Sequence, residues 1–290
     1  MFRPEIGKSA FNNLYFDSPN YMSNVSQSAE VSRRGFLKES LRLAAAGTIG
    51  AGIATGVHRT LNAPLDERIK EVIERTSPNC CKIAGEKKMC LMCGGEHQGC
   101  GSGVVLQTKQ GKFILTCHHV AQSSEQKGPQ QDAVFDVSMW DEEEKFKASP
   151  VLLQDGSRAY SEVGNGIDIA LLRIPPNCGK TEGLRLRKGE VETGESVVTV
   201  GFPSGMQLVG SGIVSGREVV PPPEAGSNFP HVFTTSPINA GGSGGAMVGM
   251  DGKLIALPRI QVGGEAQNMA GGIRNDEILK QMEKWGIEAL

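Results

Sequence analysis

One serine stands in a run of glycines that has the composition of a catalytic turn. Residues 238–247 read Ile-Asn-Ala-Gly-Gly-Ser-Gly-Gly-Ala-Met, with Ser243 near their centre. A serine that attacks an acyl group needs an exposed hydroxyl on a tight turn whose backbone N–H groups point at the same spot. Glycines allow both, because they adopt positive φ and let a substrate approach the backbone closely. Taken alone, such a run is more often a surface turn, so the rest of the chain has to decide.

Two further side chains could complete the machinery of such a serine. The strand-like residues 112–117 are followed by His118 and His119, and Asp168 precedes the apolar residues 169–172. A histidine after a strand or an aspartate before one is, taken singly, more often structural. The order histidine, aspartate, serine, each at the edge of an apolar strand, is one of three chain orders in which the Ser-His-Asp triad occurs. Together the three sites predict acyl transfer by a nucleophilic serine.

The motifs around these residues resemble those of the HtrA/Deg-type trypsin-like serine proteases. Residues 116–120 (Thr-Cys-His-His-Val) resemble their T-x-x-H-V motif, residues 168–172 (Asp-Ile-Ala-Leu-Leu) their D-I-A-L-L motif, and residues 238–245 their I-N-x-G-x-S-G-G motif. Three weaker motifs of the family also occur in order, at 101–105, 200–205 and 212–215. The likeness covers roughly residues 100–280, and several independent motifs in one order make it specific.

The resemblance implies an all-β, chymotrypsin-like fold of two six-stranded antiparallel β-barrels, with the site in the cleft between them. It implies a serine endopeptidase that cleaves polypeptides and needs no cofactor. His119, in the histidine position of the motif, would act as the base, and Asp168 would orient it; both would come from the first barrel, with Ser243 from the second. The backbone N–H groups of Gly241 and Ser243, with that of Gly242, would form the oxyanion hole.

Two positions near the serine bear on activation and specificity. Gly242 stands where chymotrypsin-type zymogens carry an aspartate that pairs with a newly cut N-terminus, so that switch is not expected. Pro237 stands six residues before the serine, where trypsin has an acidic selector. We therefore expect cleavage of unfolded polypeptide or at sites with a small or medium apolar residue before the scissile bond.

Short apolar runs separated by glycine and proline support a barrel or sandwich without any reference to a family. We expect strands at 104–106, 113–115, 169–172, 197–200, 208–209 and 254–257. At the end of the chain Ile278, Met282 and Trp285 recur at helical spacing, which predicts an amphipathic helix with Asn275 as its N-cap. HtrA-type proteases commonly carry a PDZ domain after this helix, and we expect none here.

The first 63 residues suggest export. Residues 1–31 are polar and without periodicity, which predicts a disordered extension. Residues 32–63 open with Ser-Arg-Arg-Gly-Phe-Leu-Lys ahead of a weakly apolar stretch, and so resemble a twin-arginine signal. The twin-arginine translocase would then be a partner, and the protein would be periplasmic or extracellular, with an uncleaved signal as a possible membrane anchor. The net charge of −2 gives no reason to expect a nucleic-acid partner.

Residues 64–99 contain four cysteines that need explaining, Cys80, Cys81, Cys90 and Cys93. With the C-x-x-C pair they could form a thiolate site for zinc or an iron–sulfur cluster. In an exported protein, disulfides are the competing interpretation. Our hypothesis is a disulfide-stapled, metal-free cap or linker, followed by a protease domain over residues 100–290.

Two other classes of function stay open at this level. One is a trypsin-fold binding module without activity, against which the complete Ser-His-Asp set argues. The other is an exported metal or redox protein in which the cysteine segment does the chemistry and the barrels are a scaffold.

Overall fold

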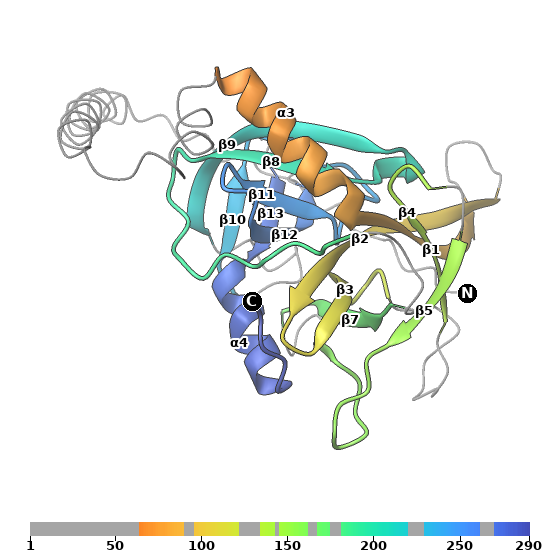
Figure 1. Ribbon diagram of the computed structural model, residues 1–290. Coiled ribbons are helices and arrows are strands. Elements are labelled where there is room, and N and C mark those ends of the chain that lie inside the picture. The colour runs from red at the N-terminus through yellow and green to blue at the C-terminus, as the bar shows by residue number, and fades with distance from the viewer. Residues whose placement is uncertain are drawn as a thin grey trace, which may run out of the picture. The chain divides into compact units, whose positions relative to one another are not determined.

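A computed structural model describes residues 64–89, 96–121, 134–142, 145–161, 167–174, 181–219, 229–261 and 270–290 (Figure 1). The predicted N-terminal extension and twin-arginine signal, together with Cys90 and Cys93, lie outside these residues.

The first barrel is built from strands in the N-terminal half of the described chain. They are β1 (Cys80–Met89), β2 (Glu96–Thr108), β3 (Gly111–Cys117), β4 (Phe135–Met139), β5 (Lys145–Pro150), β6 (Tyr160–Ser161) and β7 (Ile169–Arg173). Their order in space is β3-β2-β1-β4-β5-β7-β6, and β3 also pairs with β7. That extra pairing closes β1 to β5 and β7 into a six-stranded antiparallel barrel, with β6 added at β7.

The second barrel follows the same plan with the later strands. They are β8 (Ser196–Gly201), β9 (Leu208–Val219), β10 (His231–Thr234), β11 (Ala246–Gly249), β12 (Leu254–Gln261) and β13 (Ala270–Arg274). They close in the order β10-β13-β12-β11-β8-β9. The predicted fold of two six-stranded antiparallel barrels is therefore confirmed, and each of the six predicted strands lies within an observed one.

Consecutive apolar residues in these strands serve two different cores. Alternate side chains of a strand point to opposite faces. In β3, Ile114 packs inside the first barrel, whereas Leu115 packs in a core that residues of both barrels share. A third cluster, which includes Met247 and Ile255, fills the second barrel. Because both faces of the strands are covered, the sequence shows continuous apolar runs rather than alternation.

The sequence predicted that residues 64–99 form a cap or linker, but part of this segment belongs to the first barrel. Its strand β1 lies between β2 and β4 and is one of the barrel staves. Cys80 points into the core between the barrels and Cys81 into the first barrel, so the two thiols face opposite ways. Both side chains are fully buried and lie on opposite faces of β1, so they are not placed to bind one metal ion together. The charged end of β1, Glu-Lys-Lys-Met, concealed this strand from sequence reasoning.

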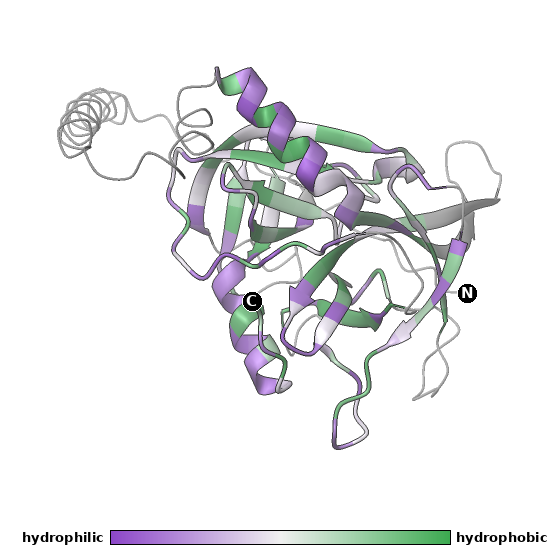
Figure 2. Cartoon of the chain, in the orientation of Figure 1, coloured by the Kyte–Doolittle hydropathy of each residue, from purple (hydrophilic) through white to green (hydrophobic). Residues whose placement is uncertain are grey.

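The described helices lie on the outside of the barrels. They are α3 (Leu65–Thr76), α4 (Asn275–Lys284) and the short 3₁₀ turns η1 (Ser77–Asn79) and η2 (Pro203–Gly205). In Figure 2, hydrophilic and hydrophobic residues alternate along α3 and α4, as in helices that bury one face. Val72 of α3 and Ile278 of α4 enter the shared core.

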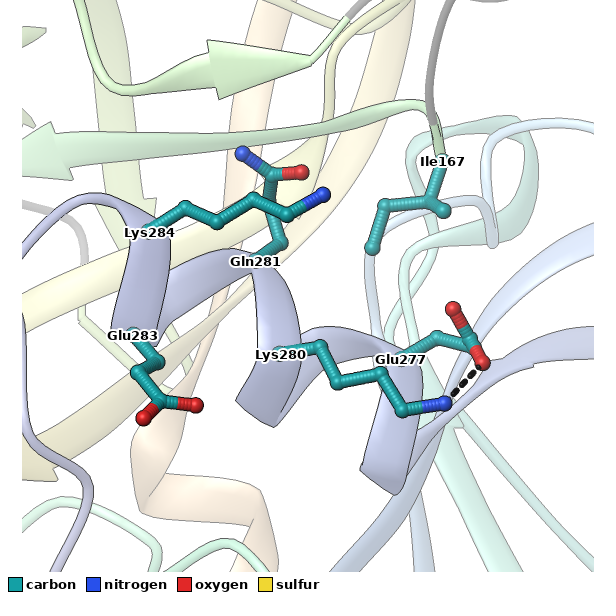
Figure 3. A pocket seen from close by; sticks show the side chains of 6 residues that line it. All are labelled: Ile167, Glu277, Lys280, Gln281, Glu283 and Lys284. Atoms are coloured by element: carbon teal, nitrogen blue, oxygen red, sulfur yellow. Dashed lines mark hydrogen bonds and ion pairs between the residues drawn. The ribbon is translucent and has the colours of Figure 1, made fainter.

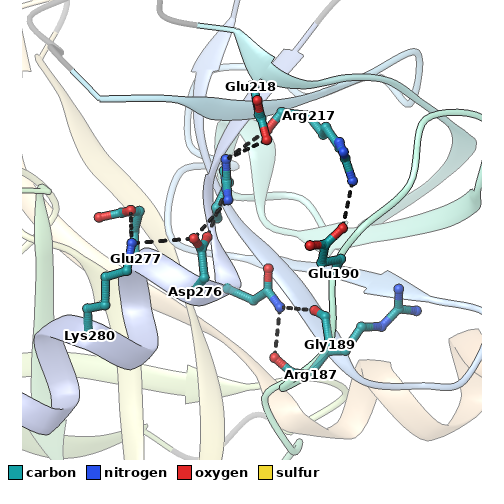
Figure 4. Close-up of polar contacts among 10 residues, drawn as sticks. Arg187, Gly189, Glu190, Arg217, Glu218, Asp276, Glu277 and Lys280 are labelled. Atoms are coloured by element: carbon teal, nitrogen blue, oxygen red, sulfur yellow. Dashed lines mark hydrogen bonds and ion pairs between the residues drawn. The ribbon is translucent and has the colours of Figure 1, made fainter.

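The predicted C-terminal helix is present, but its start differs in detail. Asn275 is the first helical residue and not the N-cap, which is Arg274. The side-chain amide of Asn275 instead donates to the carbonyl oxygens of Arg187 and Gly189, at 2.8 Å each. Nη2 of Arg274 also pairs with Oδ2 of Asp276 at 2.8 Å. Figure 4 shows the polar contacts that Asp276 and Gly189 make in this region. These contacts attach the start of α4 to the segment that leads into the second barrel.

Within the described residues, no helix is both long enough and apolar enough to cross a membrane.

Candidate active site

The pairing of β3 with β7 brings His119 and Asp168 together. Cys117 at the end of β3 is registered opposite Ile169 at the start of β7. His119 lies two residues beyond the first and Asp168 one residue before the second, so the antiparallel ladder places them side by side. The Nδ1 atom of His119 lies 2.8 Å from Oδ2 of Asp168, and the backbone N–H of His119 donates to Oδ1 at 3.0 Å.

Asp168 has a special backbone and a fully buried side chain. Its φ of +58° lies in the left-handed region, which non-glycine residues rarely adopt. Residues held in such conformations cluster at functional sites. Its carboxylate is 0% exposed, while the His119 side chain is 41% exposed and can meet a substrate. Burial by itself raises the pKa of Asp168, but the hydrogen bonds and charge of His119 and the bond from Arg259 outweigh burial and hold that pKa below its usual range.

His118 does not belong to this arrangement. Its side chain is buried and its ring stacks on Tyr160 of β6, with ring centroids 4.7 Å apart. Its backbone N–H donates to the carbonyl oxygen of Asp168 at 3.1 Å. The structure thus separates the two adjacent histidines into a packing residue and an exposed one.

Arg259 is a partner of Asp168 that the sequence reasoning missed. It lies in β12, and its Nε atom is 2.6 Å from Oδ2 of Asp168, the oxygen that also faces His119. Its side chain is 6% exposed, so this is a buried ion pair. In the sequence Arg259 stands inside an apolar run, after Pro258, and a charge in such a run is the one signal that could have pointed to it.

Ser243 lies on the turn that leads into β11, close to the same group of residues. Its Oγ donates to the carbonyl oxygen of Arg259 at 3.3 Å. Among the described residues, no hydrogen bond joins Ser243 to His119. The next residue, Gly244, has a φ of +84°, and a Cβ there would lie 2.2 Å from the carbonyl oxygen of Ser102. The glycine after the serine is therefore required by both conformation and space.

The turn presents two backbone N–H groups without an acceptor among the described residues, those of Gly241 and Ser243. The carbonyl oxygen of Ala240 accepts from the N–H of Ser204 at 2.9 Å. Because a trans peptide is planar, this bond turns the N–H of Gly241 the opposite way, away from Ser204. The N–H of Gly242 is already used, since it donates to the carbonyl oxygen of Asn239 at 2.8 Å. Of the three predicted oxyanion residues, Gly241 and Ser243 thus keep a donor to offer and Gly242 does not.

A small cavity of about 100 Å³ opens beside this turn. Its wall is made mainly of backbone and apolar side chains, and Thr199 contributes the one hydroxyl. The lining residues are Thr199, Val200, Gly201, Pro203, Leu208, Val209, Gly210, Pro237, Ile238, Asn239, Gly242 and Pro258. Pro237, which the sequence placed in the specificity position, is among them. The cavity suits a small apolar side chain.

A larger hollow of about 340 Å³ lies along α4, away from these residues. It is lined by Ile167 and by the polar side chains Glu277, Lys280, Gln281, Glu283 and Lys284 (Figure 3). Lys280 bonds to Glu277 at 2.7 Å. These are ordinary solvated pairs of a helix surface and carry no catalytic group.

The ligand atoms of Cys117, His119 and Asp168 lie within 4.8 Å of one another, a spacing that a metal ion could bridge. Burial and the nearby Asp168 charge raise the pKa of the Cys117 thiol well above its usual value, so without a metal ion this thiol is protonated. The Arg259 guanidinium lies 2.6 Å from Oδ2 of Asp168, and its positive charge would repel a cation at that oxygen.

Comparison with known proteins assigns the chain to a family that agrees with this site. Residues 101–257 match the trypsin-like peptidase domain. The chain belongs to the trypsin-like peptidase family. The matched segment begins at β2 and ends in β12, so it contains His119, Asp168 and Ser243.

The relatives are of the HtrA type, which confirms the resemblance seen in the motifs. The chain is 30% identical over 161 residues to the "Probable periplasmic serine protease do/HhoA-like" of Haemophilus influenzae. This alignment covers 55% of the chain and 30% of that protein. The chain is also 30% identical over 183 residues to the "Serine protease Do-like HtrA" of Bacillus subtilis, covering 57% and 34%. The alignments thus span about a third of the length of these relatives.

Proposed function

We propose that the protein is a serine endopeptidase in which Ser243, His119 and Asp168 form the catalytic triad. The observation that supports it best is the 2.8 Å contact of His119 Nδ1 with a buried, ionised Asp168, made beside a glycine turn that carries Ser243. An aspartate at Nδ1 fixes the imidazole tautomer that leaves Nε2 free to accept a proton. Membership of a peptidase family supports peptide-bond hydrolysis as the reaction of this site.

In the proposed reaction Ser243 Oγ attacks the carbonyl carbon of the scissile peptide while its proton passes to His119 Nε2. The hydroxyl must first rotate away from the carbonyl oxygen of Arg259, and this rotation accompanies substrate binding. The negative oxygen of the tetrahedral intermediate is met by the N–H groups of Gly241 and Ser243. His119 then gives its proton to the departing amine, and water hydrolyses the acyl-enzyme by the same route.

The cavity beside the serine supports a substrate preference. Its volume of about 100 Å³ and its mainly apolar wall favour alanine, valine or a similar residue before the scissile bond. Pro237 offers no charge to lysine or arginine. Such residues become accessible when a protein unfolds, so we propose unfolded polypeptide as the substrate class.

We also propose export by the twin-arginine translocase, to the periplasm or the cell exterior. Residues 32–38 carry the arginine pair and the following Phe-Leu-Lys, and one relative is named as a probable periplasmic protease. The proposed chemistry uses no metal or other cofactor.

Labelling with a fluorophosphonate probe tests the activity, because only an activated serine reacts. The wild-type protein should label and should cleave reduced casein, and Ser243→Ala should do neither while it keeps the wild-type circular dichroism spectrum. Ser215→Ala, which removes an exposed hydroxyl on β9, is the matched control and should behave as wild type. A wild-type protein that neither labels nor cleaves would refute the proposal.

A further inference from the structure

Ser102 in β2 connects the first barrel to the turn that carries Ser243. Its Oγ donates to the carbonyl oxygen of Gly241 at 2.7 Å and accepts from the N–H of Phe202 at 2.8 Å. Its backbone N–H donates to the carbonyl oxygen of Ser243 at 2.9 Å. Its own carbonyl oxygen accepts from Oγ1 of Thr116 at 2.7 Å. Four hydrogen bonds thus meet at one residue that is 0% exposed.

The bond from Phe202 gives the hydroxyl of Ser102 a single direction. A hydroxyl has one proton to donate, and its lone pairs accept. Because the N–H of Phe202 occupies the accepting side, the proton of Ser102 is available for the carbonyl oxygen of Gly241. Buried and fully paired groups of this kind hold one geometry, since losing a partner in a low-dielectric interior is costly.

These bonds fix the peptide units around the two free amides. The carbonyl of Ala240 is in the same peptide unit as the N–H of Gly241, and the carbonyls of Gly241 and Ser243 are in the units on either side of the N–H of Ser243. The carbonyl of Ala240 is held by the N–H of Ser204, the carbonyl of Gly241 by Oγ of Ser102, and the carbonyl of Ser243 by the N–H of Ser102. Each bond sets the tilt of a planar peptide, so the N–H groups of Gly241 and Ser243 between them have little freedom to turn.

The glycines around Ser102 leave room for it and for little else. A Cβ on Gly201 would lie 3.0 Å from Oγ of Ser102, and a Cβ on Gly244 would lie 2.2 Å from its carbonyl oxygen. The close approach of β2 to the serine turn therefore depends on small residues on both sides. Among the described residues, the hydroxyl of Ser102 is the one side-chain donor to the carbonyl oxygen of Gly241.

We propose that Ser102 is a positioning residue, which acts through the carbonyl oxygens of Gly241 and Ser243 to aim their neighbouring N–H groups at the oxyanion. This role rests on the proposed endopeptidase function. Removing the hydroxyl loosens the Gly241 peptide and weakens stabilisation of the tetrahedral intermediate. The oxyanion exists only near the transition state, so the expected loss falls on kcat and leaves KM nearly unchanged.

The experiment compares wild type, Ser102→Ala, Ser102→Cys and the exposed control Ser215→Ala on a peptide amide substrate. Removing an oxyanion donor outright costs on the order of 10²–10³ in kcat, so loss of a residue that aims a donor should cost about 10- to 100-fold. We expect this fall for Ser102→Ala with KM within about two-fold of wild type. Ser102→Cys keeps a weak donor of similar shape and should lie between Ser102→Ala and wild type, and it also serves if the alanine variant does not fold.

Inhibitor binding separates this role from a merely structural one. A peptide aldehyde forms an oxyanion on Ser243, whereas the cleaved product peptide binds without one. For Ser102→Ala the aldehyde Ki should rise in parallel with the fall in kcat, while the Ki of the product peptide stays unchanged. A normal kcat, or a loss carried by KM and by product binding alone, would overturn the positioning role while the wild type remains an active protease. A wild type that fails to label with fluorophosphonate would instead remove the proposed function and this role with it.

Discussion

Arg259 donates from Nε to Oδ2 of Asp168 at 2.6 Å, and both side chains are buried. The aspartate of the proposed triad is therefore half of an ion pair in the core between the barrels, as well as the partner of a histidine. Removing one member of a buried pair leaves a desolvated charge and costs about 3–5 kcal/mol in typical cases.

We predict that Arg259→Ala lowers the free energy of unfolding at pH 7 by about 3 kcal/mol or more. The folded-state pKa of Asp168 is depressed, so the stability it contributes is present above its unfolded pKa of ~3.9 and is lost as pH falls through the folded value. The deficit of the variant should thus be full at pH 7 and shrink below about pH 4. Urea unfolding at several pH values measures this.

The matched control for Arg259 is Arg217→Ala, whose partner Glu190 is exposed. Exposed pairs contribute about 0–1 kcal/mol, so this variant should stay close to wild type. Equal losses in the two variants, or a deficit that does not change with pH, would contradict the role given to the Arg259 pair.

We predict opposite effects for the two adjacent histidines. His119→Ala should lower kcat/KM by on the order of 10⁴-fold, because the proposed base is lost, with little change in stability. His118→Ala should keep activity within a few-fold and lose about 1 kcal/mol of stability, because its ring stacks on Tyr160. Steady-state kinetics and thermal unfolding of the two variants decide the assignment, and the reverse pattern would exchange the roles.

The specificity cavity leads to a prediction on peptide substrates that differ only before the scissile bond. Alanine and valine should give the highest kcat/KM, and phenylalanine and lysine values at least about ten-fold lower. Pro237→Asp places a carboxylate in the cavity wall and should raise cleavage after lysine relative to valine. If Pro237→Asp leaves that ratio unchanged, the cavity does not receive this side chain.

We predict that Cys100 is the first of the four described cysteines to be alkylated in the native protein. It is half-buried, whereas Cys80, Cys81 and Cys117 are 0% exposed. Burial raises the pKa of the Cys100 thiol, so its reaction should be slower than that of a free thiol. Mass spectrometry after iodoacetamide treatment, with and without urea, measures this order. Peptides that link Cys80 or Cys81 to Cys90 or Cys93 by a disulfide would instead support the disulfide-stapled segment expected from the sequence.

Export yields a prediction for the arginine pair outside the described residues. Replacing Arg33 and Arg34 by lysine should retain the protein in the cytoplasm, because a lysine ammonium keeps the charge but not the planar, bidentate hydrogen bonding of arginine. Cell fractionation with an antibody measures the distribution. Unchanged export of the double variant would exclude the twin-arginine route.

The amino-acid sequence by itself determined the parts of this protein that are local. The glycine turn around Ser243, the histidine after β3 and the aspartate before β7 each follow from residues that are neighbours in the chain. The strands with unbroken apolar runs were predicted for the same reason. The strands that were not predicted are β1, β4, β5, β6, β10, β11 and β13. Charged residues in β1 and glycines in β13 hide the apolar pattern.

Only the tertiary structure decided which distant residues meet. The register of β3 against β7 separates His119 from His118, and closure of the first barrel turns Cys80 and Cys81 from a candidate staple into core residues. The pairing of Arg259 with Asp168 joins residues 91 positions apart, and that of Ser102 with Gly241 joins residues 139 positions apart. Such contacts depend on how the two barrels pack. Packing buries these polar groups between the barrels, and a buried polar group needs a hydrogen-bond partner, which no local preference of the chain can supply.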